Sequence, residues 1–242
     1  MLRTPAPLIG TLGCTDMTTD ACICGFSYVR GLAEDEALHR KIHSEYFIGP
    51  SVPSVLKTPV LGEIDGYAVH VVDGRSPFDT RRKIAHVAMV AHRSMSAYPA
   101  GYDGTVTEDN QRLYVLVERR RVIGFVLSAR DTRFWRLRWS EGGLVELLDR
   151  NASIHVGHKI GRVWIAAKFQ RRGLAKRLLL VASAHLGMGI SEMAWEVPFT
   201  ASGSALVRSV SPSTFFGCGD IQAVRDTISI EPPPGAASQV RR

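Results

Sequence analysis

The sequence contains no long apolar run, and this absence excludes one class of protein. Its apolar stretches all fall well short of the ~20 residues that a membrane-spanning helix needs. Residues 1–5 are followed by no sustained apolar segment, so we expect no secretory signal. Together the two absences predict an intracellular protein that has no membrane partner.

Cysteine is scarce, with four residues in a chain of 242. Cys14, Cys22 and Cys24 lie near the start of the chain, and Cys218 lies far from them. A reducing compartment disfavours disulfides, so we interpret the early cysteines as free thiols or metal ligands.

Acidic residues are absent between 150 and 191, although the chain has 23 of them in total. The formal net charge is +7 and the pI is about 9.5. An anionic ligand or a nucleic-acid-associated location would explain this excess of positive charge. The chain has neither an RNA-binding motif nor a long basic helix, which argues against direct nucleic-acid binding. The basic residues of the acid-free segment include Lys159, Arg162, Lys168, Arg171, Arg172, Lys176 and Arg177.

The motif Gln-Arg-Arg-Gly-Leu-Ala at 170–175 lies inside this basic segment. It follows a strand-like run at 162–165 and precedes a helix-like run at 174–186. A strand, a Gly-bearing loop and a helix in this order can cradle phosphate groups, because backbone N–H groups and the positive end of the helix dipole face the anion. Gly173 would let the backbone approach the anion without a Cβ between them. The alternative is a solvated basic helix in an ordinary α/β unit.

Composition and periodicity divide the chain into successive segments. We expect a flexible N-terminus at 1–20, a Cys/His module at 21–48, a linker at 47–60, a large domain at 61–230 and a flexible tail at 231–242. The spacing of apolar residues predicts helices at 34–46, 80–95, 174–186 and 203–210. Strands are predicted at 63–72, 113–117, 122–127, 162–166 and 192–197, with a closing strand pair at 215–230.

The order of hairpin, strand, Gly-bearing loop, helix and strand resembles the GNAT acetyltransferase superfamily. The segment 170–175 matches the Q/R-x-x-G-x-G/A pattern of its acetyl-CoA pyrophosphate loop. The resemblance implies an α+β GNAT fold, with a mixed, mostly antiparallel sheet and flanking helices. It also implies that the pantetheine arm lies in a notch between the strands at 162–165 and 192–197. The cofactor-binding residues would then be Val163, Trp164, Ile165, Gln170, Arg171, Arg172, Gly173, Leu174 and Ala175.

A second cluster precedes that domain. Cys22 and Cys24 are followed by His39 and His43, and the two histidines lie one helical turn apart on one face. Two thiols on a turn and two imidazoles on a helix suit a tetrahedral Zn²⁺ ion, as in a C2H2 zinc finger. Because one residue between the cysteines is fewer than usual, Cys14 is an alternative to Cys22. A small helical cap with incidental Cys and His residues is the other interpretation.

The two parts together resemble the cohesin acetyltransferases that establish sister-chromatid cohesion, which pair a C2H2 finger with a GNAT domain. The finger pattern is matched by Cys24-Gly25-Phe26-Ser27-Tyr28, Asp35, His39 and His43. The cofactor strand and loop are matched by Arg162-Val163-Trp164-Ile165 and Arg171-Arg172, and the resemblance covers about residues 22–225. It implies a protein substrate with an acceptor lysine in a chromatin-associated setting. The location would be nuclear in a eukaryotic host and cytoplasmic otherwise.

The acceptor half of the sequence departs from that family. Glu196-Val197-Pro198-Phe199 stands where the family has Ser-x-Pro-Thr, and Ala201 and Ser202 occupy the place of an acidic residue. Acetyl transfer to an amine needs a base, and Glu196 is the predicted base with Glu192 as runner-up. Both could instead be exposed carboxylates at a strand edge. The leaving thiolate needs a proton, and since no Tyr follows Tyr114, Ser202 or Ser204 is the predicted acid.

We therefore predict an acetyl-CoA-dependent protein-lysine N-acetyltransferase with a zinc finger. Two alternatives stay open because of the departures in the acceptor half. One is a GNAT enzyme that acetylates a small-molecule amine, and the other is a catalytically inactive acyl-CoA-binding module.

Overall fold

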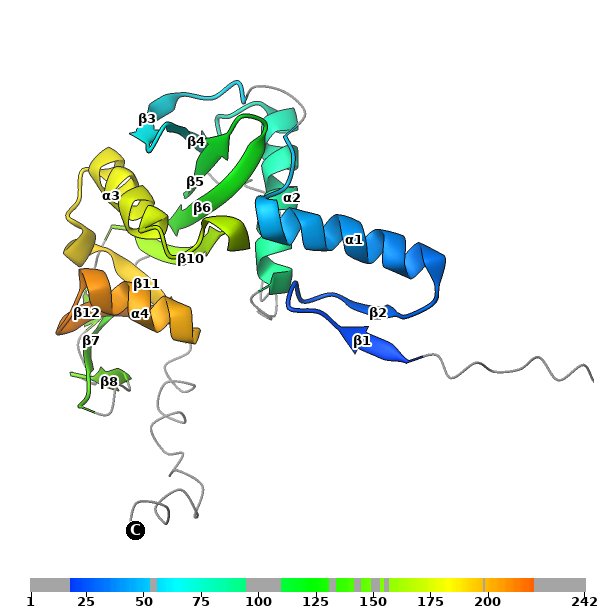
Figure 1. Cartoon of the computed structure of the whole chain (residues 1–242). Coiled ribbons are helices and arrows are strands. Elements are labelled where there is room, and N and C mark those ends of the chain that lie inside the picture. The colour runs from blue at the N-terminus through cyan, green and yellow to red at the C-terminus, as the bar shows by residue number, and fades with distance from the viewer. Residues whose placement is uncertain are drawn as a thin grey trace, which may run out of the picture.

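A computed structural model describes residues 18–52, 56–94, 110–130, 134–141, 145–148, 153–154, 157–197 and 199–219. Cys14, Pro198, the predicted flexible tail at 231–242 and the second half of the predicted strand pair, from 220 onward, lie outside these residues. The described part of the chain begins with an antiparallel hairpin of β1 (Thr19–Ala21) and β2 (Ser27–Val29), followed by the helix α1 (Ala33–Ile48) (Figure 1).

One large mixed sheet forms the centre of the molecule. All its pairings are antiparallel except those of β10 with β11 and of β11 with β12. This arrangement confirms the predicted α+β fold with a mostly antiparallel sheet. The strand order is β3 (Val60–Ile64), β4 (Tyr67–Asp73), β5 (Gln111–Glu118), β6 (Arg121–Ala129), β10 (Lys159–Ile165), β11 (Ala194–Val197), β12 (Thr214–Gly219), β7 (Phe134–Trp139) and β8 (Val145–Leu147), with β9 (Ser153–Ile154) paired to β7.

Helices cover both faces of this sheet. The helix α3 (Leu174–Leu186) packs on β3, β5, β6 and β10, and α2 (Phe78–Ser94) packs on β4 from the other side (Figure 1). In both helices the buried residues recur every three or four positions, as at Leu174 and Leu178, and each fully buried Leu contributes about 2 kcal/mol. The helix α4 (Ala201–Val210) lies beside α3. None of the helices within the described ranges is long and apolar enough to cross a membrane.

The structure confirms the helix at 174–186 and the hairpin of β5 and β6 that the sequence predicts. The single strand predicted at 63–72 is wrong, because the chain reverses direction at Asp65 and Gly66. Both residues have positive φ, at 52° and 78°, as a two-residue hairpin turn requires. The strand predicted from 192 begins instead at Ala194, after the short 3₁₀ helix η2 (Ile190–Glu192).

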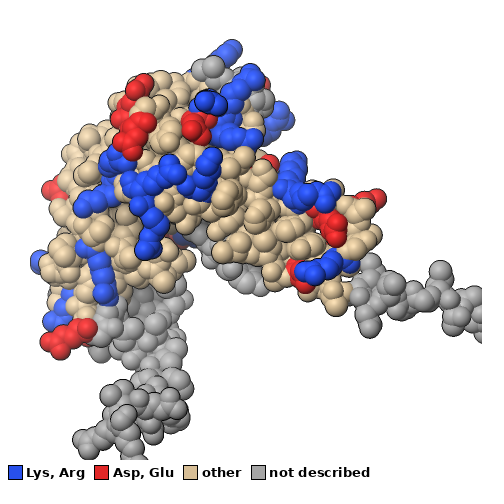
Figure 2. Space-filling view, in the orientation of Figure 1, with Lys and Arg blue, Asp and Glu red and all other residues tan. Residues whose placement is uncertain are grey.

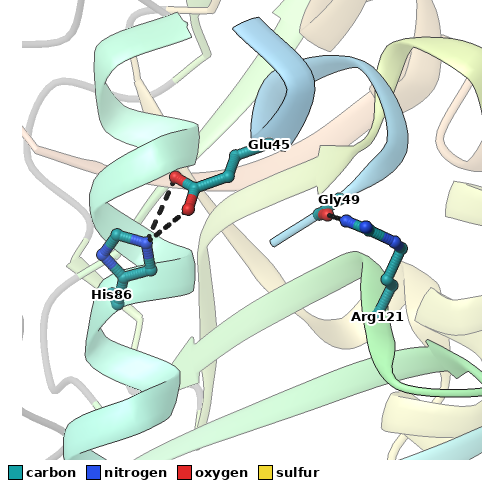
Figure 3. Close-up of polar contacts among 4 residues, drawn as sticks. All are labelled: Glu45, Gly49, His86 and Arg121. Carbon is teal, nitrogen blue, oxygen red and sulfur yellow. Dashed lines mark hydrogen bonds and ion pairs between the residues drawn. The ribbon is translucent and has the colours of Figure 1, made fainter. Parts of the chain in front are cut away.

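The segment predicted as a linker at 47–60, between the two parts of the chain, is hydrogen-bonded, in its described portion, to the turn between β5 and β6. The Val52 N–H donates to the Arg120 carbonyl at 2.7 Å, and the Val122 N–H donates to the Pro50 carbonyl at 3.1 Å. Figure 3 shows two further contacts between the parts. The Arg121 Nη1 donates to the Gly49 carbonyl at 2.8 Å, and the His86 Nε2 lies 3.2 Å from both Glu45 oxygens.

Glycines allow the closest approaches between the two parts. A Cβ on Gly49 would lie 2.2 Å from the Val122 carbonyl oxygen, and one on Gly25 would lie 2.1 Å from the Arg93 carbonyl oxygen. Both glycines also have positive φ, at 89° and 79°. The N-terminal module therefore packs directly on the domain with the large sheet.

Candidate active site and metal centre

The two parallel strands β10 and β11 separate soon after they begin. They pair at Lys159 with Ala194 and at Ile160 with Trp195, and no further pairing between them occurs within the described residues. The register of β10 against β6 shifts between Ile160 and Arg162, which leaves Gly161 as a bulge. Beyond this point β10 continues along β6 while β11 continues along β12, so a notch opens between them. Its β10 side carries Val163, Trp164 and Ile165, which the sequence predicts to bind the cofactor.

The loop after β10 presents a run of backbone N–H groups. Within the part of the chain that the structure describes, no acceptor is found for the N–H groups of residues 171–176. Arg171 and Gly173 have left-handed backbone conformations, with φ of 64° and 74°. Gly173 is the N-cap of α3 and has no side chain to cap the helix, and nothing lies within 4 Å of where its Cβ would be. The positive end of α3 is thus open to an anion.

Side chains around the loop hold its shape. The Gln170 Nε2 donates to the Ile165 carbonyl at 2.9 Å, which ties the loop to the end of β10. The Arg177 Nη2 donates to the Arg172 carbonyl at 3.0 Å and to the Asp65 Oδ2 at 2.6 Å. Hydrogen bonds from Arg177 lower the pKa of Asp65. Gln170 and Arg177 therefore support the loop, and the N–H groups of 171–176 stay available for a ligand.

Positive charge surrounds this loop. Figure 2 shows a band of Lys and Arg side chains over α3 and the segment that leads into it. The Lys168 Nζ lies 5.8 Å and the Arg172 Cζ 5.5 Å from the centroid of the buried Phe169 ring. These cations are fixed next to the loop without a neutralising carboxylate of their own segment, as a polyphosphate ligand requires.

Glu196, the predicted base, lies on β11 at the notch. Its Oε1 is 3.2 Å from the Arg162 Nη1, and both side chains are about two-thirds or more buried, with exposed fractions of 33% and 23%. The Arg162 Nη1 also donates to the Gly161 carbonyl at 2.6 Å. A Cβ on Gly161 would lie 3.0 Å from the Glu196 Oε2, so a glycine at the bulge leaves room for the carboxylate. The structure thus brings a carboxylate, a guanidinium and the bulge together.

His92 also belongs to this cluster and was missed by the sequence reasoning. Burial and then the positive charge of Arg162 lower its pKa, while the negative charge of Glu196 acts in the opposite direction. Because burial and Arg162 disfavour the protonated form, His92 is a neutral imidazole near this cluster at neutral pH. His92 continues the buried face of α2 four residues after Ala88, and this spacing was the signal available in the sequence.

The other predicted catalytic residues lie elsewhere. Glu192 is in η2, not on β11, and its Oε2 accepts a hydrogen bond from the Gly189 N–H at 2.6 Å. Ser202 is exposed in the first turn of α4, and its hydroxyl forms no hydrogen bond with another described residue. Ser204 is half-buried in the same helix. These positions do not identify a described side chain that could donate a proton to the leaving thiolate.

The four predicted metal ligands lie together at the N-terminal module. One donor atom each from Cys22, Cys24, His39 and His43 falls within 4.8 Å of all the others. The Nε2 of His39 is buried and has no hydrogen-bond partner among the described residues, which suits a metal-bound nitrogen. The Cys22 Sγ lies 3.2 Å from the His43 Nδ1. This donor set of two thiols and two imidazoles fits tetrahedral Zn²⁺.

The short spacing of the cysteines is accommodated by a tight turn. The Gly25 N–H donates to the Cys22 carbonyl at 2.8 Å, and the Cys22 N–H donates to the Phe26 carbonyl at 3.0 Å. The positive φ of Gly25 allows this turn, which points both thiols toward α1. The Tyr28 ring stacks on His39 with centroids 4.0 Å apart and orients it. Cys14, the alternative ligand, lies outside the described residues.

Comparisons with known proteins find relatives that cover most of this chain. No family model matches the sequence. The N-acetyltransferase ECO1 of Debaryomyces hansenii is 25% identical over 232 residues, which cover 81% of this chain and 78% of that protein. The solved xEco2 acetyltransferase domain superposes with a TM-score of 0.57 at 17% identity, over 69% of this chain and 98% of that one. The same domain bound to a K105-CoA conjugate gives a TM-score of 0.55 at 16% identity, over 67% and 98%.

The superpositions confirm the predicted acetyltransferase fold. The likeness to a named N-acetyltransferase along most of the chain supports the predicted enzyme class, acetyl-CoA as donor and the resemblance drawn from residues 22–225. The residue assignments at the notch and the metal site rest on the geometry described above.

Proposed function

We infer that this chain is an acetyl-CoA-dependent N-acetyltransferase of the cohesin acetyltransferase type, acting on a lysine of a protein. One observation carries the proposal. Residues 171–176 offer backbone N–H groups that have no partner among the described residues, at the positive end of α3 and shortly after the strand that borders the notch. A diphosphate held by these groups would place a pantetheine arm along Val163, Trp164 and Ile165.

The cluster at Gly161 supplies groups for the chemistry. The acceptor lysine must lose a proton before its nitrogen attacks the thioester carbonyl carbon, and Glu196 is the proposed base. Arg162 keeps that carboxylate at the notch, and burial and the charge of Arg162 hold the nearby His92 imidazole neutral. When the C–S bond breaks, the acetyl group stays on the lysine nitrogen and the thiolate takes up a proton. The tetrahedral oxyanion would accept a hydrogen bond from a backbone N–H of β10.

The N-terminal module favours a protein acceptor over a small amine. It packs on the domain at α2, where Gly25 lies against the Arg93 carbonyl, and the pKa of the adjacent His92 responds to the charges of Arg162 and Glu196. We propose that it binds one structural Zn²⁺ through Cys22, Cys24, His39 and His43. The resemblance extends the proposal to a chromatin-associated acceptor and, in a eukaryotic cell, to the nucleus.

An assay of acetyl transfer with two panels of acceptors tests this proposal. One panel contains lysine-bearing proteins and peptides, and the other contains polyamines and aminoglycosides. Transfer to a protein lysine is the expected result. Transfer to small amines alone would instead support the second candidate, which the altered segment Glu196-Val197-Pro198-Phe199 favours. Tight CoA binding without any turnover would leave an acyl-CoA-binding module as the function.

A further inference from the structure

A second basic cavity lies at the end of β10 that is remote from the phosphate loop. The phosphate loop comes after Ile165, the last residue of β10, whereas His158 immediately precedes Lys159, the first residue of β10. The cavity has a volume of about 440 Å³ and is formed where β4, β5, β6 and β10 begin or end. We call it the strand-end pocket, and its charged and polar lining consists of Asp73, Arg75, Asn110, Arg112, Arg130 and His158.

Positive charge is in excess in the strand-end pocket. It has three guanidinium groups and one carboxylate. The Oδ1 of that carboxylate, Asp73, already accepts hydrogen bonds from the Arg75 N–H at 3.0 Å and from the Ser76 N–H at 3.1 Å. None of the three arginines forms an ion pair in the part of the chain that the structure describes. The pocket therefore holds three positive charges against one described carboxylate.

The register of the sheet strands holds these charged residues close together. Arg112 lies directly opposite Asp73 on β4 and opposite Ser128 on β6, so the register fixes its position. Arg130 follows the last residue of β6, and its backbone N–H donates to the Asn110 carbonyl at 2.9 Å. His158 forms a buried part of the lining, with 8% of its surface exposed, and its Nδ1 lies 3.5 Å from the Ser128 Oγ.

The positive charge of the arginines lowers the pKa values of two neighbouring histidines. Burial, and then the positive charges of Arg112 and Arg130, lower the pKa of His158. Burial and Arg112 also lower the pKa of His185, in the last turn of α3, although Asp73 acts in the opposite direction. Positive potential of this kind, in a partly buried cavity, favours an anion as its occupant.

We propose that the strand-end pocket binds a phosphoryl group through Arg75, Arg112 and Arg130. A guanidinium group presents a planar fork of N–H donors that matches the oxygens of a phosphate. The volume lies within the range of small-molecule sites, so the phosphate is carried on a larger group. A phosphorylated small molecule and a phosphorylated side chain of a protein share this chemistry. The site is separate from the phosphate loop and does not depend on acetyl transfer.

Binding of inorganic phosphate to the full chain tests the proposal. Phosphate is titrated at constant ionic strength and pH into the wild type, the variant Gly173→Glu and the double variant Arg75→Gln/Arg130→Gln, and binding is followed by calorimetry and by the shift in melting temperature. Gly173→Glu removes the competing site at the phosphate loop. Arg75 and Arg130 are exposed at the rim, so their replacement should leave the fold intact, which circular dichroism checks.

Gly173→Glu should still bind phosphate, at the site that remains when the phosphate loop is blocked. The dissociation constant of that site should rise at least about tenfold in Arg75→Gln/Arg130→Gln, because two charge-assisted hydrogen bonds to the anion are lost. The control double variant Arg40→Gln/Arg82→Gln removes the same charge from exposed positions elsewhere and should bind like the wild type. An equal loss in this control, or no phosphate binding to Gly173→Glu, would overturn the proposal. A phosphoserine peptide and glycerol 3-phosphate then compete for the site, and the tighter one identifies the source of the phosphate.

Discussion

Glu196 illustrates how the site depends on single residues and on their neighbours across strands. The sequence places it on a strand that follows a basic segment, and its selection as a base rests on that position alone. The structure adds the Arg162 guanidinium at 3.2 Å and the bulge at Gly161, neither of which can be inferred from spacing along the chain. Such contacts depend on register between distant segments, so the sequence could propose the carboxylate but not its partners.

Replacing Glu196 by Gln tests its role as the base. The amide keeps the shape of the side chain but cannot take a proton, so we expect kcat to fall by about 100-fold or more while acetyl-CoA affinity is unchanged. Steady-state kinetics and calorimetric binding of CoA measure the two effects separately. Glu192→Gln serves as the comparison, because Glu192 accepts a hydrogen bond from the Gly189 N–H in η2. Equal losses in the two variants would show that neither carboxylate is the base.

His92 and Glu192 mark the limits of prediction at this scale. His92 was missed because its role depends on how α2 packs against the sheet, which a sequence pattern does not specify. Glu192 is predicted at the start of a strand, whereas η2 delays the start of β11 by two residues. Ends of elements are set by local hydrogen bonds that periodicity does not reveal.

At the scale of elements, α3 shows why some predictions succeed. Gly173 and Gly187 stand at its two ends in left-handed conformations, and a regular apolar face lies between them. Both kinds of signal are local, so the sequence alone gives the helix correctly. The hairpin of β3 and β4 was predicted as one strand because Asp65-Gly66 was not recognised as a two-residue turn. The order of strands in the sheet, with β7 beside β12, depends on contacts far apart along the chain and was not predicted.

The phosphate loop is tested by placing one charge at either end of α3. Gly173 and Gly187 have φ of 74° and 68°, and neither has an atom within 4 Å of an added Cβ. Replacing either by Glu therefore causes similar backbone strain, of about 1 kcal/mol. Only Gly173→Glu puts a negative charge among the N–H groups of 171–176, so we expect its dissociation constant for acetyl-CoA to rise by more than about tenfold. Calorimetry that finds equal affinities in the two variants would contradict the assignment of the loop.

The metal centre is tested by removing two of its ligands. His39 and His43 each supply one nitrogen to the cluster, so His39→Ala/His43→Ala should lose the bound zinc completely. The melting temperature should also fall, because metal binding contributes directly to the stability of a small module. Elemental analysis measures the zinc, and thermal unfolding measures the stability. His86→Ala, outside the cluster, is the control and should keep one zinc per chain. A wild-type protein that contains no zinc would refute the site.

At the scale of the whole molecule, histidines with lowered pKa values link stability to pH. His92 lies in α2, His158 immediately before β10 and His185 in the last turn of α3, and desolvation is the largest cause of the lowered pKa of each. In the unfolded chain each has its ordinary value of 6.5. Below that pH the unfolded state binds more protons than the folded state, so the free energy of unfolding should fall as the pH falls through 6.5. Urea unfolding at a series of pH values measures this. A free energy that stays constant between pH 7.5 and 5.5 would contradict the lowered values.

The close packing of the N-terminal module on the sheet domain predicts that the two unfold together. Gly49 has a φ of 89°, and an added Cβ would lie 2.2 Å from the Val122 carbonyl oxygen, which belongs to the backbone and cannot rotate away. Gly66→Ala provides the matched control, because Gly66 has a similar φ of 78° but open space around it. Gly49→Ala should therefore lower the free energy of unfolding by about 2 kcal/mol more than Gly66→Ala does. Because Gly49 also accepts the Arg121 hydrogen bond, the loss should appear in a single transition monitored both at the module and at the sheet. Two separate transitions, with the sheet unaffected by Gly49→Ala, would show that the module and the sheet domain unfold independently.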